Sequence, residues 1–245
     1  MCIHPNKNNR KVRGVLRQDT SRVTFVMVKI YMKNNGVIFD CDGTLLNSLG
    51  HATTSFNWAL ENIGELRRTP EEIKRFFGQA ANRIFLQLLG DEAKASKAFD
   101  SYCNHQAELA VGIDLFPGIQ ALLQGLKNLD VPMALVTGRH ERDLEVILRR
   151  HNLGNYFVTM IADNHLAKSK PAPDGILLAA SRMKLDPKVT FYVGDSTIDL
   201  QAAKAAGAKA IAALWDPLVD VDAMSKEKPA HQFKKPMDLL SIFES

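Results

Sequence analysis

Residues 37–46 read Val-Ile-Phe-Asp-Cys-Asp-Gly-Thr-Leu-Leu, an apolar run that ends in two aspartates one residue apart and then a glycine. The run before Asp40 lacks any alternation of apolar and polar side chains, which is typical of a buried strand in a parallel sheet. Asp40 then lies at the carboxyl end of that strand, where open parallel sheets bind their ligands. Side chains alternate along a strand, so Asp40 and Asp42 should share one side. Two anions in one pocket stay together around a cation or with one of them protonated, and we therefore expect a divalent metal ion at this edge.

The composition is that of an ordinary globular protein with one large domain or two small ones. Of the 245 residues, 46% are hydrophobic and 24% are charged, which is enough apolar material for a sizeable core. No apolar run reaches the roughly 18 residues that a transmembrane helix needs, so we expect no membrane partner. Three scattered cysteines fit neither a disulfide framework nor a zinc site. A reducing compartment, by default the cytoplasm, is expected.

The positive net charge comes from a basic leader. Residues 1–35 hold eight Lys and Arg against one Asp, a net charge of +7, so the +4 of the whole chain leaves −3 for the remaining 210 residues. A nucleic-acid-binding surface needs its basic charge on the folded body, and we expect no nucleic-acid partner. Residues 1–21 are expected to be disordered. Three interpretations of the leader remain open: a targeting peptide, a functional basic tail, or an artefact of the gene boundary if translation starts at Met27 or Met32. The segment Arg22–Tyr31 either adds an edge strand or only associates non-specifically.

The chain from residue 51 to residue 113 has helical periodicity and no strand pattern. Thr69-Pro70-Glu71-Glu72 carries the threonine, proline and glutamate of a capped helix start. From residue 116 onward helical and strand patterns alternate, which indicates parallel βαβ units. We therefore predict a core of residues 36–50 and 114–245, interrupted by a helical cap domain of residues 51–113. The expected cap helices span 52–62, from 69 onward, 81–89 and 92–111, and the expected core strands span 37–39, 133–136, 157–162, 189–193 and 209–213, with a terminal helix near 236–243.

Polar side chains follow several of the predicted strands at their carboxyl ends. They are Asp40, Asp42, Thr137, Lys170, Asp195 and Asp199. Each alone has a structural explanation, since an aspartate at a strand end often caps a helix and a loop lysine is often solvated. Because the carboxyl ends of parallel strands meet at one edge of a sheet, their recurrence favours a shared site.

Four motifs occur in order: Asp40-x-Asp42-Gly43-Thr44, Thr137 after an apolar strand, Lys170-Pro171, and Gly194-Asp195-x-x-x-Asp199. Together they resemble the haloacid dehalogenase superfamily of phosphohydrolases over residues 36–243. The helical block is placed where the phosphoglycolate phosphatase-like and β-phosphoglucomutase-like branches carry a helical cap. The resemblance implies an α/β fold, a doubly wound, Rossmann-like parallel sheet with an inserted small helical cap.

The resemblance also implies roles for the acids. Asp40 would be the nucleophile that forms an aspartyl-phosphate. Asp42 would protonate the leaving oxygen and then activate water, a second acid that the family's halide-displacing members lack. Mg²⁺ is the implied cofactor, held by the carboxylates of Asp40 and Asp195, the backbone carbonyl of Asp42 and waters, with Asp199 acting through water.

The other motif residues would handle the phosphate and the rest of the substrate. The resemblance implies that Lys170, Thr137 and backbone N–H groups such as that of Gly138 hold the phosphoryl oxygens. Arg139 stands beside Gly138 where relatives often show Asn-Lys, and it either reaches a second anionic group or is a solvated helix-start residue. Arg83, in a polar turn of the cap, is a second candidate substrate contact.

The function expected from these residues is a Mg²⁺-dependent phosphatase acting on a small phosphorylated metabolite, with phosphoglycolate as the leading candidate. A phosphomutase that returns the phosphoryl group to a sugar and an inorganic pyrophosphatase are close alternatives. A phospho-acceptor regulatory module is an alternative of another class, because receiver domains also place acids, a threonine and a lysine at strand ends. The protein is expected to be a monomer or a homodimer.

Overall fold

The computed structural model describes residues 35–76, 78–109 and 112–244. The predictions made for the basic leader, including the strand-like segment Arg22–Tyr31 and the start at Met27 or Met32, lie outside the described residues. Within those residues, no helix combines the length and the apolar character required to cross a membrane.

The core is one six-stranded sheet in which every neighbouring pair of strands is parallel, in the order β3-β2-β1-β4-β5-β6. The strands are β1 (Gly36–Phe39), β2 (Met133–Val136), β3 (Thr159–Ile161), β4 (Thr190–Gly194), β5 (Lys209–Ala213) and β6 (His231–Phe233). Phe39 of β1 is in register with Leu135 of β2 and with Val193 of β4. The residues that follow these three strands therefore meet at one edge of the sheet.

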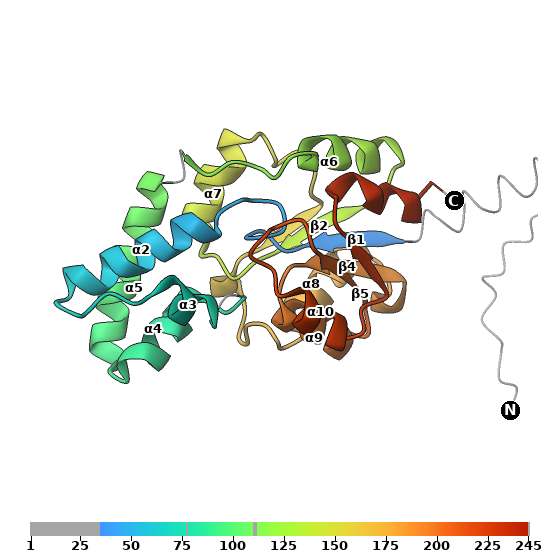
Figure 1. Cartoon of the computed structure of the whole chain (residues 1–245). Coiled ribbons are helices and arrows are strands. Elements are labelled where there is room, and N and C mark those ends of the chain that lie inside the picture. The colour runs from blue at the N-terminus through green and yellow to red at the C-terminus, as the bar shows by residue number, and fades with distance from the viewer. Residues whose placement is uncertain (1–34, 77, 110–111, 245) are drawn as a thin grey trace, which may run out of the picture.

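Helices cover both faces of the sheet, as Figure 1 shows. One face carries α6 (Ile119–Asn128), α7 (Glu141–Arg150) and the 3-10 helix η4 (Pro236–Ile242), and the other carries α8 (Asp174–Met183), α9 (Thr197–Ala206) and α10 (Val221–Lys226). Side chains of the central strand alternate between the two cores, with Val37 and Phe39 in one and Ile38 in the other. All three are fully buried, which explains the unbroken apolar run. The predicted doubly wound α/β fold is confirmed.

A block of four helices lies beyond the carboxyl ends of the strands, at the left of Figure 1. The helices are α2 (Leu49–Asn62), α3 (Pro70–Lys74), α4 (Ala81–Leu89) and α5 (Glu92–Leu109). They have an apolar core of their own, built around Phe56, Leu60 and Phe85. The capping box of α3 forms as the sequence predicts, because the Thr69 side chain accepts from the Glu72 N–H and the Glu72 carboxylate accepts from the Thr69 N–H. The division into a core and a cap domain stays a prediction.

One strand and one α-helix of the core were not predicted from the sequence. The edge strand β6 is three residues long with largely exposed side chains, and it forms by pairing with β5. It therefore lacks the apolar run that identifies the inner strands. The short helix α10 is capped by Asp220, whose side chain accepts from the Ala223 N–H. The predicted terminal helix is a 3-10 helix.

Candidate active site

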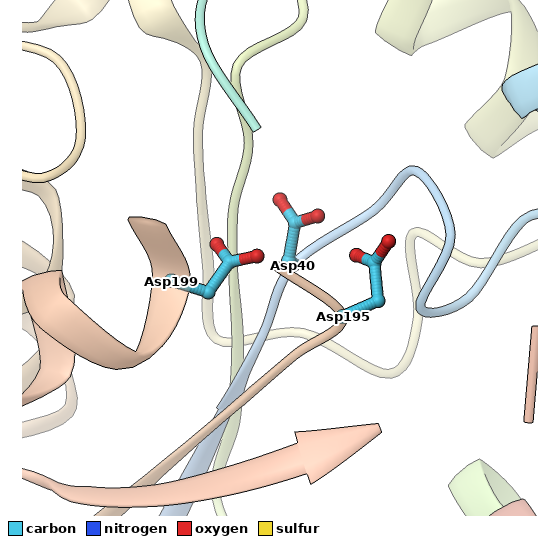
Figure 2. A group of neighbouring side chains, drawn as sticks. All are labelled: Asp40, Asp195 and Asp199. Carbon is cyan, nitrogen blue, oxygen red and sulfur yellow. The ribbon is translucent and has the colours of Figure 1, made fainter. Parts of the chain in front are cut away.

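Three carboxylates meet at the edge of the sheet where β1 and β4 end. Asp40 follows β1, Asp195 follows β4, and Asp199 lies in the first turn of α9. Figure 2 shows their carboxylate groups on the same side of the strand ends, and one oxygen from each lies within 4.8 Å of one from both others. The sequence prediction that these acids converge on one site agrees with this geometry.

Lys170 lies against this cluster and is 7% exposed. Its ammonium donates to Oδ1 of Asp40 at 2.7 Å and to Oδ1 of Asp199 at 2.6 Å. Burial by itself would lower the pKa of the lysine, but the charges of Asp199 and Asp40 hold it well above its ordinary value. Lys170 therefore remains a cation and offsets part of the negative charge of the cluster.

Both oxygens of Asp199 accept hydrogen bonds. Oδ2 accepts from the backbone N–H of Ser196 at 3.1 Å and from its hydroxyl at 2.6 Å. The backbone bond, together with that from the Asp199 N–H to Oγ of Ser196 at 3.3 Å, forms the capping box of α9. Oδ1 accepts from Lys170 and, at 3.2 Å, from the hydroxyl of Tyr192. Sequence reasoning missed Tyr192; its only signal was a phenol within a buried strand, a group that usually finds a polar partner.

Asp40 and Asp195 are the acids that fit a divalent cation best. Burial, followed by the charge of Asp199, raises the pKa of Asp40 from 3.8 to about 7 against the opposing effect of Lys170. Asp195 is half-buried as a residue, yet desolvation of its carboxylate, and then the charges of Asp199 and Asp40, hold its pKa well above the ordinary value. A cation among these oxygens would relieve both effects. The donor set consists of carboxylate oxygens, which are the ligands that Mg²⁺ prefers.

Gly43 makes room for this arrangement. Its φ of +74° belongs to the left-handed region, and a Cβ at this position would lie 2.1 Å from Oδ2 of Asp195. The motif glycine is therefore required both by the turn and by the closeness of the acid.

Asp42 does not join the three carboxylates. It lies after the end of β1 and lines the same cavity as Asp40, but its carboxylate is held by other partners. Oδ1 of Asp42 accepts from the hydroxyl of Ser48 and from Nε and Nη2 of Arg139, at 3.0 and 2.7 Å for the arginine atoms. Of the groups of Asp42, only the backbone carbonyl is therefore assigned to the metal ion, and this assignment stays a prediction.

Arg139 is 6% exposed, so the alternative of a solvated helix-start residue is wrong. Besides its two bonds to Asp42, it donates from Nη1 to Oε1 of Gln106 on α5 at 3.2 Å. Gln106 in turn donates to the backbone carbonyl of His51 on α2 at 3.5 Å. Arg139 therefore connects the loop after β2 with the helical block. The sequence shows no signal for Ser48 or Gln106, because neither belongs to a motif.

Thr137 and Gly138 lie at the end of β2, facing the block. Thr137 is 1% exposed, and its hydroxyl accepts from the backbone N–H of Arg139 at 3.1 Å. A Cβ on Gly138 would lie 3.5 Å from the backbone oxygen of Gln79. Gly78, with a φ of +90°, comes closer still, since a Cβ there would lie 2.5 Å from the hydroxyl of Ser196. The turn before α4 thus packs directly on the loops that carry the site.

A cavity separates the strand ends from the helical block. The core lines it with Asp40, Asp42, Gly138, Arg139, His140, Lys170 and Asp195, and the block lines it with Leu49, Ala52, Phe56, Gly78, Gln79, Ala81, Ile84, Phe99, Tyr102 and Cys103. Arg83 is exposed on α4 and is not among these residues. The structure thus places Arg139 at the cavity and Arg83 outside its lining.

Comparison with known proteins identifies the family. The family model of the haloacid dehalogenase-like hydrolases matches residues 37–213. A phosphoglycolate phosphatase of Pseudomonas putida is 30% identical over 183 residues, which are 71% of this chain and 67% of that protein. A phosphoglycolate phosphatase of Aquifex aeolicus is 24% identical over 210 residues, which are 85% of this chain and 96% of that protein. Among solved structures, a Lactobacillus plantarum protein with 28% identity aligns with a TM-score of 0.77 over 84% of this chain and 98% of its own.

These matches confirm the predicted family and the predicted enzyme class, a phosphatase that hydrolyses phosphoric monoesters. The chain therefore belongs to the haloacid dehalogenase-like hydrolase family.

Proposed function

We propose that this phosphatase hydrolyses a small phosphorylated metabolite through an aspartyl-phosphate on Asp40, with Mg²⁺ as cofactor. The observation that carries the proposal is the position of Asp40, whose Oδ1 is held by Lys170 at 2.7 Å at the mouth of a cavity lined by further acids. A carboxylate can attack phosphorus only if its own charge and that of the phosphoryl oxygens are offset. Lys170 provides a buried cation at that point.

The steps follow from the residues around the cavity. A carboxylate oxygen of Asp40 forms a bond to phosphorus while the bond to the leaving oxygen breaks, and protonated Asp42 gives its proton to that oxygen. A water molecule then attacks the phosphorus, Asp42 takes the proton of that water, and the bond to Asp40 breaks to release inorganic phosphate. Thr137, Lys170 and the N–H of Gly138 hold the phosphoryl oxygens in both steps.

Asp40 and Asp195 would hold the cation, with the backbone carbonyl of Asp42 as a further oxygen ligand. When bound, Mg²⁺ neutralises the negative charge that gathers on the phosphoryl oxygens. Asp199 has both oxygens occupied by Lys170, Tyr192 and Ser196. We assign it to orienting Lys170 and to contacting the cation through water.

The substrate is argued from the relatives. The phosphatases of Pseudomonas putida and Aquifex aeolicus are named for phosphoglycolate, so phosphoglycolate is the first natural compound to assay. The cavity between the block and the sheet encloses the site, which favours a small molecule over a phosphorylated protein.

The test is hydrolysis of p-nitrophenyl phosphate with Mg²⁺ by the full chain and by Asp40→Asn. The variant keeps the size of the side chain and removes the nucleophile, so we expect kcat to fall by about 10⁴-fold or more. Superimposable circular dichroism spectra and a cooperative unfolding transition for both proteins would show that the fold is intact, since the loss of the charge paired with Lys170 is itself expected to change the Tm. Turnover by Asp40→Asn within tenfold of the parent would refute the assignment of Asp40.

A further inference from the structure

The two walls of the cavity differ in chemistry. The core contributes the acids, Lys170, Arg139 and His140, whose ring lies against Phe99, whereas the wall formed by the helical block is mostly apolar. Its apolar members are Leu49, Ala52, Phe56, Ala81, Ile84 and Phe99. Four of them are well packed, at 2 to 8% exposure, so this wall is a built surface. The polar groups on this wall are the amide of Gln79, the phenol of Tyr102 and the thiol of Cys103, none of which supplies a positive charge.

The lysine and arginine side chains of the lining are already engaged by the protein. In the part of the chain that the structure describes, Lys170 and Arg139 are the two that line the cavity. Lys170 is paired with Asp40 and Asp199. Arg139 gives two donors to Asp42 and one to Gln106. To bind Lys170 or Arg139, a second anionic group on a substrate would therefore have to displace the aspartates that already pair with them.

Charge balance works in the same direction. The lining holds Asp40, Asp42 and Asp195 beside Lys170 and Arg139. A divalent cation offsets the two charges of a phosphoryl dianion, which leaves no surplus positive charge for a further anionic group. An additional carboxylate, placed against Leu49 and Ile84, would lose its hydration without gaining a counter-charge, which is a severe cost.

Resting on the proposed phosphatase function, we propose that the cavity selects phosphomonoesters whose organic group is uncharged and largely apolar. That group lies against the apolar wall of the block while the phosphoryl group faces Asp40. Phosphoglycolate, whose organic part is a carboxylate, is then a poor substrate. In hydrophobic pockets each buried methylene is worth about tenfold or more in kcat/KM, so the preference should be measurable with simple esters.

The experiment compares kcat/KM for phosphoglycolate, isobutyl phosphate and benzyl phosphate with Mg²⁺, using the full chain. All three release an alcohol, so the chemical step is the same and the organic group is the variable. We expect at least one apolar ester to exceed phosphoglycolate by about tenfold or more. An equal or higher kcat/KM for phosphoglycolate would overturn the inference, as would hydrolysis of p-nitrophenyl phosphate but of neither apolar ester. Failure to hydrolyse any of the four compounds would instead refute the proposed function.

Variants at Ala81 test where the organic group lies. Ala81 is half-buried at the start of α4 and lines the cavity. A longer side chain is therefore accommodated more easily at this position than at a tightly packed one such as Phe56. Ala81→Lys supplies the missing cation, and Ala81→Met is the matched uncharged control. We expect the ratio of kcat/KM for phosphoglycolate to that for benzyl phosphate to be about tenfold higher in Ala81→Lys than in Ala81→Met.

Two results would contradict this placement of the organic group. The first is an equal ratio in the two Ala81 variants when both unfold at the temperature of the parent. The second is a selective loss of phosphoglycolate turnover in Arg83→Ala, because it would show that a cation outside the described lining reaches the substrate.

Discussion

Replacing Lys170 by methionine removes the buried cation while keeping a linear side chain of similar length. The structure predicts a large effect, because the ammonium lies 2.7 Å from Asp40 and 2.6 Å from Asp199, with side-chain exposures of 6%, 6% and 0% for the three residues. At an effective dielectric constant of 20 each contact is an attraction of about 6 kcal/mol. Most of that attraction offsets the cost of burying the charges. Removing one partner of such a buried group typically lowers the free energy of unfolding by about 3–5 kcal/mol.

The loss should depend on pH with a defined sign. Without Lys170 the carboxylates of Asp40 and Asp199 keep their burial but lose the group that favours their charged forms. The pKa of Asp40, which burial already raises to about 7, then rises further above its value in the unfolded chain, so the folded variant binds a proton and is stabilised as the pH falls. We expect the destabilisation by Lys170→Met to be larger at pH 8 than at pH 5.5.

Urea unfolding in EDTA at the two pH values measures this difference. Lys168→Met is the matched control, because Lys168 lies in the same loop and is exposed. It should change the free energy of unfolding by less than about 0.5 kcal/mol. A loss below about 1 kcal/mol for Lys170→Met at pH 8, or an equal loss at both pH values, would refute the assignment of Lys170 as the charge that holds the acids together.

Three further results are expected. Because burial raises the pKa of Asp40 from 3.8 to about 7, its contribution to the stability of the metal-free protein is lost as the pH rises through 7. The gain in Tm on adding Mg²⁺ should therefore be larger at pH 8 than at pH 6, and a larger gain at pH 6 would contradict this. Gly43→Ala places a Cβ 2.1 Å from Asp195 Oδ2, so a Mg²⁺ titration of activity should show at least about tenfold weaker metal binding, and an unchanged titration would argue against Asp195 as a ligand. Gln106→Leu removes an acceptor of the buried Arg139 and should cost about 1–2 kcal/mol in urea unfolding, whereas a change within about 0.5 kcal/mol would show that the contact contributes little.

The sequence predicts the sheet and the convergence of its acids well because both follow from local patterns. Buried parallel strands are short apolar runs, and register alone then brings the residues after β1, β2 and β4 to one edge. The strand β6 could not be predicted in this way, because its side chains are largely exposed and it forms by pairing with β5.

The contacts around the motif residues are much less predictable. Tyr192 reaches Lys170 and Asp199 from inside a strand, and Gln106 reaches Arg139 from a helix 33 residues earlier in the chain. Such contacts depend on how helices pack on the sheet, which no short motif encodes.

The contact of Gly78 with Ser196 restricts how this enzyme can diverge. A side chain at position 78 would be strained by the φ of +90°, and its Cβ would lie 2.5 Å from the hydroxyl of Ser196. Either the turn before α4 or the Ser196 side chain then has to shift, beside the cavity that every substrate must enter. New substrate preferences can arise more easily at Gln79 and Ala81, which line the cavity and already carry side chains. Variation among homologues should therefore spare position 78 and accumulate at its neighbours.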